Sequence, residues 1–340
     1  MGRLNTLAEQ RATVAWSTEY SSGRHSVRKI ASASDLRSAF GDELRRYFAL
    51  AALSRSTTAP AQMVSDAMGL VFRVRVVLEQ DVAAALTSLA ARDGIGALGL
   101  SREPLHGHSK KQGVSIRMPL SSCVPSKICG AACYAHDVLD AAPASVVRGA
   151  VNGAIAGWYE RGDQSQREEL LDALAQPVGR MIDAARKDAR AAAATFERRP
   201  RIRFAHVGEF APFPEFANAL ARRVHESSDG EVDCVVYTRH PDARLLDPDL
   251  FVVLFSLDES SEDRRRFIPV TARAVRSAFG GLVTDTVDVN FLEHHRWIHV
   301  KPVGNGKICP STAPEASVRT CDGCRCDFCF KPKQITGKQK

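Results

Sequence analysis

The chain has 340 residues, of which 44% are hydrophobic and 25% are charged. These values are ordinary for a globular protein and exclude a collagen, a coiled-coil rod and a fully disordered chain. The net charge is +7, and residues 1–120 supply +6 of it through 16 Lys and Arg against 10 Asp and Glu. A basic region of this kind permits contact with nucleic acid without requiring it. The apolar runs are too short to span a bilayer and Met1–Gln10 lacks the apolar segment of a secretion signal, so we expect a cytoplasmic protein.

The amino-terminal region, residues 1–112, is expected to be basic and largely helical. Residues 1–30 have no apolar periodicity and suggest a loose arm. A helix is predicted from Ser34 to Leu53, where large apolar side chains recur about once per turn. The segment Ala61–Ala91 favours a helix at both ends. Its centre, Leu70–Leu78, alternates apolar and arginine side chains and therefore predicts a strand.

From residue 113 onward, predicted strands and helices alternate, which favours parallel strands covered by helices. The predicted strands are Gly113–Leu120, Arg201–Phe210, Asp233–Arg239 and Leu250–Leu257, with two short candidates at Gly281–Asp285 and Trp297–Val303. The predicted helices are Ala144–Ala156, Gln166–Thr195, Phe213–Glu226 and Arg264–Phe279. Pro177 should kink or split the second of these helices. We therefore expect an α/β core at residues 113–303, arranged as a full or partial (β/α) barrel, although an open sheet fits the same order.

The first cluster of cysteines follows the first core strand directly. Cys123, Cys129 and Cys133 form a C-x5-C-x3-C run, and the chain carries nine cysteines without a secretion signal, which argues against a disulfide framework. Three thiolates on one loop can bind three irons of a four-iron cluster and leave the fourth iron open to a ligand. A zinc site completed by a residue such as His136 is an alternative, and so are buried cysteines without a metal.

A second cluster of cysteines occupies residues 304–330 and offers five thiols where a tetrahedral metal site needs four. Its members are Cys309, Cys321, Cys324, Cys326 and Cys329. One candidate ligand set is Cys309, Cys321, Cys324 and Cys329. Cys326 can replace one of these four or stay free. Structural zinc and a second iron–sulfur cluster fit this spacing equally well. Cys234 stands alone and is most simply a buried strand residue, and the basic tail at residues 331–340 is expected to be disordered.

Polar residues also follow three successive predicted strands. Gly208-Glu209 ends one strand, Tyr237-Thr238-Arg239 ends the next, and Ser256 lies near the end of the third. Parallel strands deliver such residues to one rim, where barrels and open α/β sheets bind ligands. A glycine allows close backbone approach, and a glutamate accepts hydrogen bonds from an ammonium group. Each residue alone is more often a cap or turn residue, but together they suggest a ligand-binding rim.

The cysteine loop after a strand, followed by a strand that ends in Gly208-Glu209, resembles the radical S-adenosylmethionine superfamily. Residues 113–330 are also similar to the phage "gene product 88" family, whose motifs occur here in the same order. These motifs are Cys133-Tyr134-Ala135, Arg148-x3-Asn152, Gly208-Glu209-Phe210, Tyr237-Thr238-Arg239, the strand end at Ser256 and the terminal cysteines. The superfamily usually has a C-x3-C-x2-C run, so the cysteine spacing here is wider.

The resemblance to the radical superfamily implies both cofactors and site residues. Cys123, Cys129 and Cys133 would hold a four-iron, four-sulfur (4Fe–4S) cluster, and S-adenosylmethionine would occupy its open iron. Gly208 and Glu209 would contact the methionine end. Tyr237, Arg239 and Ser256 complete the candidate cofactor-binding set, while the catalytic residues are unknown.

The leading hypothesis is therefore an iron–sulfur enzyme of the radical S-adenosylmethionine type that acts on an unknown substrate. The cluster would pass one electron to the sulfonium and generate a 5′-deoxyadenosyl radical, so an electron donor would be a partner. The second cysteine cluster would carry an auxiliary cluster or zinc. The alternative is a protein without catalytic activity, in which the cysteine clusters hold structural zinc and the basic amino-terminal region binds nucleic acid. Neither hypothesis involves a membrane.

Overall fold

The computed structural model describes residues 61–94, 105–109, 113–126, 128–129, 143–193, 198–278, 284–292 and 307–309. The chain divides into two compact units. The first contains helix α4 (Ala61–Asp93), residues 119–121 and the part of helix α6 (Pro143–Arg161) up to Ile155. The second contains the sheet and the helices that follow α6. None of the described helices is both long enough and apolar enough to cross a membrane.

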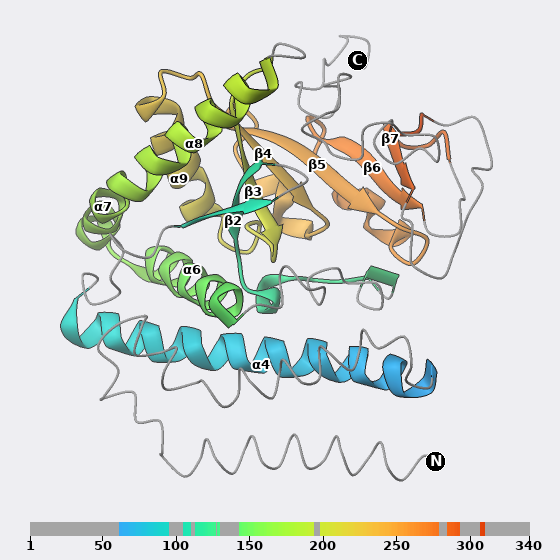
Figure 1. The fold of residues 1–340 in the computed structure, drawn as a ribbon, viewed down its shortest axis with the longest axis horizontal. Coiled ribbons are helices and arrows are strands. Elements are labelled where there is room, and N and C mark those ends of the chain that lie inside the picture. The colour runs from blue at the N-terminus through green and yellow to red at the C-terminus, as the bar shows by residue number, and fades with distance from the viewer. Residues whose placement is uncertain are drawn as a thin grey trace. The chain divides into compact units, whose positions relative to one another are not determined.

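The second unit is built on a seven-stranded sheet in which spatial order follows chain order (Figure 1). Its strands are β1 (His106–Ser109), β2 (Gly113–Arg117), β3 (Arg201–Val207), β4 (Asp233–Thr238), β5 (Phe251–Leu257), β6 (Arg273–Ala278) and β7 (Val289–Leu292). β1 pairs antiparallel with β2, and each later strand is parallel to its neighbour. The expected α/β architecture is confirmed. Among the described residues the sheet is open, with β1 and β7 at its edges, so they do not form a closed barrel.

The constant direction of the strand order restricts the crossover connections. Connections between parallel strands are right-handed almost without exception. Because the order never reverses, right-handed connections all pass over the same face of the sheet. A doubly wound sheet differs, since its order reverses at a switch point and its helices cover both faces. Because β2 to β7 are parallel, their carboxyl ends lie along one rim of the sheet. The strand order does not reverse at any point along this rim.

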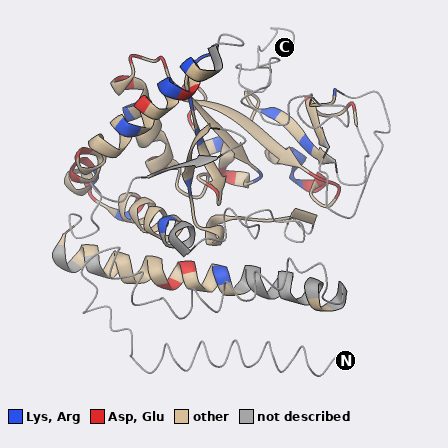
Figure 2. Ribbon diagram, viewed as in Figure 1, with Lys and Arg blue, Asp and Glu red and all other residues tan. Residues whose placement is uncertain are grey.

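Three helices follow α6 in the second unit, namely α7 (Gln164–Ala173), α8 (Ala175–Ala193) and α9 (Pro214–Ser227). A capping box of Asp163 and Gln166 starts α7. The long predicted helix is split as expected, because α8 begins two residues before Pro177 and places that proline in its first turn, where a missing N–H costs little. Charges of both signs are mixed along α7 and α8 (Figure 2), as on a solvated surface.

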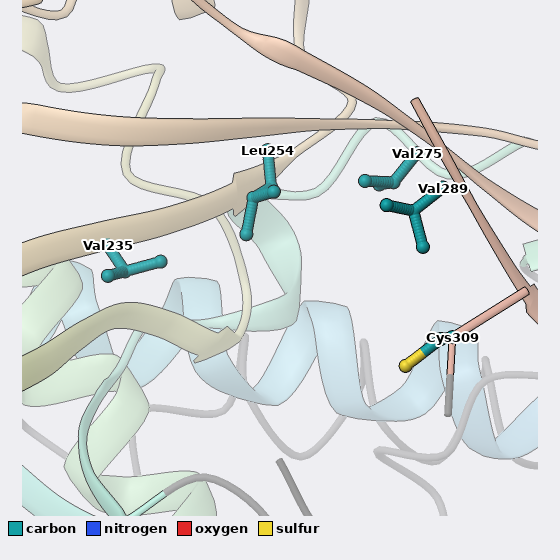
Figure 3. Close-up of a cluster of buried hydrophobic side chains, with 5 residues drawn as sticks. All are labelled: Val235, Leu254, Val275, Val289 and Cys309. Atoms are coloured by element: carbon teal, nitrogen blue, oxygen red, sulfur yellow. The ribbon is translucent and has the colours of Figure 1, made fainter. Parts of the chain in front are cut away.

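The sheet buries apolar side chains on both faces. On one face, the Phe204 ring packs edge-on against Phe251 at 5.0 Å and also contacts Phe210, which stacks on Phe216 of α9. Alternate residues of β4 to β7 form an apolar cluster on the other face (Figure 3). This cluster consists of Val235, Leu254, Val275, Val289 and Cys309. Cys234, only 1% exposed, is the buried strand residue that the sequence predicts.

Residues 307–309 continue the parallel pairing beyond β7. Ile308 forms a parallel bridge with Asn290, and the Cys309 N–H donates to the Asn290 carbonyl at 2.8 Å. The Asn290 N–H donates in turn to the Lys307 carbonyl, also at 2.8 Å. This short pairing is what brings Cys309 onto the apolar cluster, where it is 4% exposed.

Two predicted elements are wrong. Leu70–Leu78 lies inside α4 and is not a strand. Its alternation is produced by Val and Arg residues that a helix also accommodates, and Arg75 makes an (i, i+4) ion pair with Glu79 that only a helix brings together. Arg264–Phe279 is not a helix. Its first residues belong to the 3₁₀ helix η6 (Glu262–Phe267), and β6 follows. Pro269 interrupts the helix, and sheet pairing outweighs the helix propensity of Arg and Ala.

Several further predictions concern residues outside the described ranges. The helix at Ser34–Leu53, the strand at Trp297–Val303 and the tail at 331–340 all lie there. Of the candidate strand Gly281–Asp285, only its last two residues are described, and they are not in a strand. The last strand of the sheet is instead β7, a few residues later.

Candidate functional site

The carboxyl ends of β2, β3, β4 and β5 carry the polar residues of the candidate site. After β2 comes a loop that we call the Cys loop, residues 122–129, which contains Cys123 and Cys129. Gly208 and Glu209 follow β3, Arg239 follows β4 and Asp258 follows β5. All of these residues belong to the second unit. The parallel order of the strands thus gathers residues from four separate parts of the chain.

The turn after β3 is shaped by a bulge and a glycine. Ser115 pairs with Arg203 and Arg117 with Val207, so β3 has more residues than β2 between these pairs, and Ala205 adopts a φ of 62°. Gly208 has a φ of 76°, and a Cβ there would lie 2.6 Å from the Met118 carbonyl carbon. Only glycine combines this backbone conformation with so close an approach. At Gly208 the close neighbour is thus the backbone of Met118, and the predicted approach of a ligand to this residue stays a prediction.

Glu209 is directly connected to the Cys loop. Its N–H donates to Ser122 Oγ at 2.8 Å, and its Oε1 accepts from the Arg239 N–H at 3.3 Å. The residue is only 5% exposed, and its Oε2 has no hydrogen-bond partner among the described residues. Burial raises the pKa of Glu209 to about 7, although the Thr238 hydroxyl and the Arg239 N–H oppose the rise. A buried acceptor without a donor is costly, so this atom is suited to a ligand N–H.

Ser126 of the Cys loop is bound by an ion pair between two strand ends. Arg239 Nη1 lies 2.8 Å from Asp258 Oδ2 and 3.1 Å from Ser126 Oγ, and Ser126 Oγ also donates to Asp258 Oδ2. The same Oγ accepts the Cys129 N–H at 3.0 Å. Burial alone would raise the pKa of Asp258, but hydrogen bonds from Ser126 and Ser260 and the charge of Arg239 lower it below its ordinary value.

The guanidinium of Arg239 lies within electrostatic range of the Cys129 thiol. Burial lowers the pKa of Arg239, but attraction to Cys129, Asp258 and Glu209 outweighs burial and raises it above the ordinary value. A nearby permanent cation lowers the energy of a thiolate relative to a thiol. Arg239 thus places a positive charge near the sulfur of Cys129.

Residues after β5 also contact the backbone of the Cys loop. Arg264 of η6 donates to the Val124 carbonyl at 2.5 Å and to the Pro125 carbonyl at 3.2 Å. Ser260 Oγ accepts the Ile128 N–H at 3.1 Å. The Cys loop is therefore fixed by contacts from the ends of three strands, as a preorganised binding site requires.

Two other predicted residues lie on the sheet face that carries the apolar cluster. Tyr237 is on β4, and the Arg203 guanidinium lies 4.4 Å from the centre of its ring. Arg203 also acts electrostatically on Glu209. Ser256 is on β5 and pairs with Val275 of β6. Tyr237 thus connects to Glu209 through Arg203, whereas Ser256 makes no contact with the Cys loop among the interactions of the described residues.

Of the predicted metal ligands, the structure describes Cys123, Cys129 and Cys309. Cys123 and Cys129 are partly exposed, and neither forms a disulfide with another described residue. The other predicted ligands, Cys133, Cys321, Cys324, Cys326 and Cys329, lie outside the described ranges, as does His136. No group of three or more His, Cys, Asp or Glu that could hold a metal occurs among the residues that the structure describes.

The residues that hold the Cys loop were not predicted from the sequence. Ser122, Ser126, Ser260 and Arg264 make contacts that span from 87 to 140 residues of sequence. Serine and arginine are common in loops, and no spacing within the chain links these positions. Asp258 stands at a strand end, which marks the rim but does not reveal its partner.

The chain matches no family model, no curated protein and no solved structure at a significant level.

Proposed function

We propose that the chain is an iron–sulfur enzyme of the radical S-adenosylmethionine type, built on a partial (β/α) barrel. Cys123, Cys129 and Cys133 hold a 4Fe–4S cluster in this proposal. The observation that supports it best is the hydrogen bond between Glu209 N–H and Ser122 Oγ, 2.8 Å long. It joins the turn proposed to bind S-adenosylmethionine to the loop proposed to bind the cluster.

Two of the three proposed cluster ligands are described, and their surroundings support the proposal. Thiolates are the ligands that iron–sulfur clusters take, and Cys123 and Cys129 are partly exposed on one loop. Arg239 favours the thiolate at Cys129 and offsets the negative charge that a cluster would bring. Ser126 Oγ accepts the Cys129 N–H, so this contact holds the backbone from which the sulfur projects.

The same rim fits an amino acid ligand. Glu209 Oε2 is a buried acceptor without a donor among the described residues, and the ammonium group of a methionine moiety would supply one. Binding a cation there would hold Glu209 in its ionised form against the effect of burial on its pKa. Arg203, which lies on the Tyr237 ring, provides positive charge beside it for a carboxylate.

Cluster and S-adenosylmethionine together would supply one-electron reductive chemistry. The chain's own part is to hold and orient them. Glu209 binds the amino group, Arg239 and Asp258 fix the Cys loop, and the apolar face of the sheet limits access of water. Six parallel strands in sequential order support the partial barrel, because the strand order never reverses as it does in a doubly wound sheet. The carboxyl-terminal cysteines would hold an auxiliary cluster or zinc, and an external electron donor would be needed.

Cysteine substitutions test the proposal. Cys129→Ala should lose about four irons and four sulfides per chain relative to the unaltered protein purified without oxygen. Cys234→Ala is the matched control, because Cys234 is buried in β4 and should leave the iron content unchanged. Equal iron in the two variants, or zinc without sulfide in the unaltered protein, would contradict the proposal. Zinc alone, together with steeply salt-dependent binding of DNA or RNA, would favour the nucleic-acid alternative.

A further inference from the structure

Helix α4 carries a fully buried ion pair. Arg75 Nε lies 2.9 Å from Glu79 Oε1, and both side chains are 0% exposed. Replacing a buried ion pair by apolar side chains of similar size is often neutral or stabilising, so such a pair is weak evidence of a role in stability alone. Its position in α4 is also outside the part of the chain that resembles a known family. The contacts of Glu79 therefore need an explanation of their own.

The second oxygen of Glu79 binds the turn that precedes Cys123. Glu79 Oε2 accepts the N–H of Leu120 at 2.5 Å and the N–H of Ser121 at 3.4 Å. Both residues belong to the 3₁₀ helix η3 (Leu120–Ser122), which starts soon after β2 ends. Glu79, Leu120 and Ser121 lie in the same compact unit. The first amides of a helical turn have no partner within the turn, and a buried carboxylate satisfies them strongly.

The turn that Glu79 holds leads directly into the site. Ser122, the last residue of η3, accepts the Glu209 N–H through its Oγ, and the next residue is Cys123. Leu120 and Ser121, which Glu79 holds, are therefore joined directly along the chain to the first residues of the Cys loop. Burial raises the pKa of Glu79, and Arg75 and the two amide donors oppose that rise. Arg75 thus opposes the effect of burial on Glu79 and, through the 2.9 Å ion pair, holds its carboxyl group in place.

We propose that Glu79 is a positioning residue for the Cys loop, which it orients by holding Leu120 and Ser121. Arg75 fixes Glu79 in this role. The effect of Glu79 on iron content rests on the proposed function. The effect of Glu79 on the order of the Cys loop does not.

Two double variants of the full chain separate this role from a general need for the ion pair. Arg75→Met with Glu79→Gln removes both charges but keeps an amide oxygen that can accept from η3. Arg75→Met with Glu79→Met removes the charges and the acceptor, in a side chain of similar length. The measurements are amide hydrogen exchange at Leu120 and Ser121, and the alkylation rates of Cys123 and Cys129 in metal-free protein. Cys234 alkylation reports on the whole fold, since this thiol is buried in the sheet.

In the Met/Met variant, the amides of Leu120 and Ser121 should exchange about tenfold faster than in the Met/Gln variant, because a lost buried hydrogen bond allows local opening. Cys123 and Cys129 should be alkylated faster by the same factor. Cys234 should stay equally protected in both. Equal rates in the two variants would overturn the inference, and so would a parallel rise at Cys234. In protein purified without oxygen, the Met/Met variant should also hold less iron. If the unaltered protein binds no iron, the proposed function fails while the alkylation rates still decide the role of Glu79.

Discussion

Arg239 and Asp258 form an ion pair of 2.8 Å between the ends of neighbouring parallel strands, and Ser126 of the Cys loop binds both side chains. Asp258 is 0% exposed. The strands β4 and β5 thus do more than extend the sheet, because the residues that follow them act together on a loop more than a hundred residues earlier. The order of the strands makes this possible, since it brings the carboxyl ends of β2 to β5 to one edge.

The first prediction concerns this ion pair. Asp258→Asn should lower the free energy of unfolding by about 3 kcal/mol, because it leaves Arg239 buried without its counter-charge. The matched control is Asp172→Asn, which breaks an ion pair with Arg223 of the same 2.8 Å length in which the carboxylate is 78% exposed. That change should cost at most about 1 kcal/mol. Urea denaturation of both variants measures the difference, and equal losses would refute the importance of burial here.

The second prediction separates backbone conformation from close packing at Gly208. Gly208 and Gly230 have similar φ values of 76° and 70°, but a Cβ meets the Met118 backbone at 2.6 Å only at Gly208, and at Gly230 it meets nothing within 4 Å. Gly230→Ala should cost about 1 kcal/mol for the left-handed conformation alone. Gly208→Ala should cost at least about 2 kcal/mol more, because the strand end must move. Similar free energies of unfolding for the two variants would show that the Met118 backbone can move away from the new Cβ without loss of stability.

The third prediction follows from the pKa of Glu209, which burial raises from an ordinary 4.5 to about 7. Between these values the folded protein keeps a proton that the unfolded chain releases. The free energy of unfolding should therefore fall as pH rises from 4.5 to 7, by about 3 kcal/mol at most, and then level off. Glu209→Gln has no proton to lose at this position.

The measurement is the free energy of unfolding of metal-free protein at several pH values across this window. The difference between the unaltered protein and Glu209→Gln isolates the contribution of this one carboxyl group. A difference that is constant with pH would show that Glu209 titrates at its ordinary value. A difference that grows in the opposite direction would mean that contacts with Arg239 and Thr238 outweigh burial.

Much of the parallel sheet could be predicted because its strands are short apolar runs that alternate with helices. Helix α9 was predicted to within a residue, since its apolar residues recur on one face. β6 could not be predicted, because its sequence of Arg, Ala, Val and Ser has no strand pattern and gains its structure only from pairing with β5 and β7. The same limit explains Leu70–Leu78, where local alternation is outweighed by the helix on either side.

For the candidate site, local sequence identified the rim but not the contacts that hold it. Glu209 and Arg239 were found because each follows a predicted strand. The bond between the Arg239 N–H and Glu209 joins two of the predicted residues. Ser126 and Asp258 are 132 residues apart, and only the folded sheet brings them together. Glu79 lies in a segment whose helix was in part predicted as a strand, so its contact with η3 had no signal in the sequence.

The most direct test of the central claim is electron paramagnetic resonance of protein that has been purified without oxygen and reduced, with and without S-adenosylmethionine. Because the proposed cluster has one iron without a protein ligand, its signal should change when S-adenosylmethionine is added. The change should be absent in Cys129→Ala and weakened in Glu209→Ala, in which the acceptor for the amino group is lost. A 4Fe–4S signal that S-adenosylmethionine does not alter, or a protein that contains zinc and no sulfide, would contradict the account.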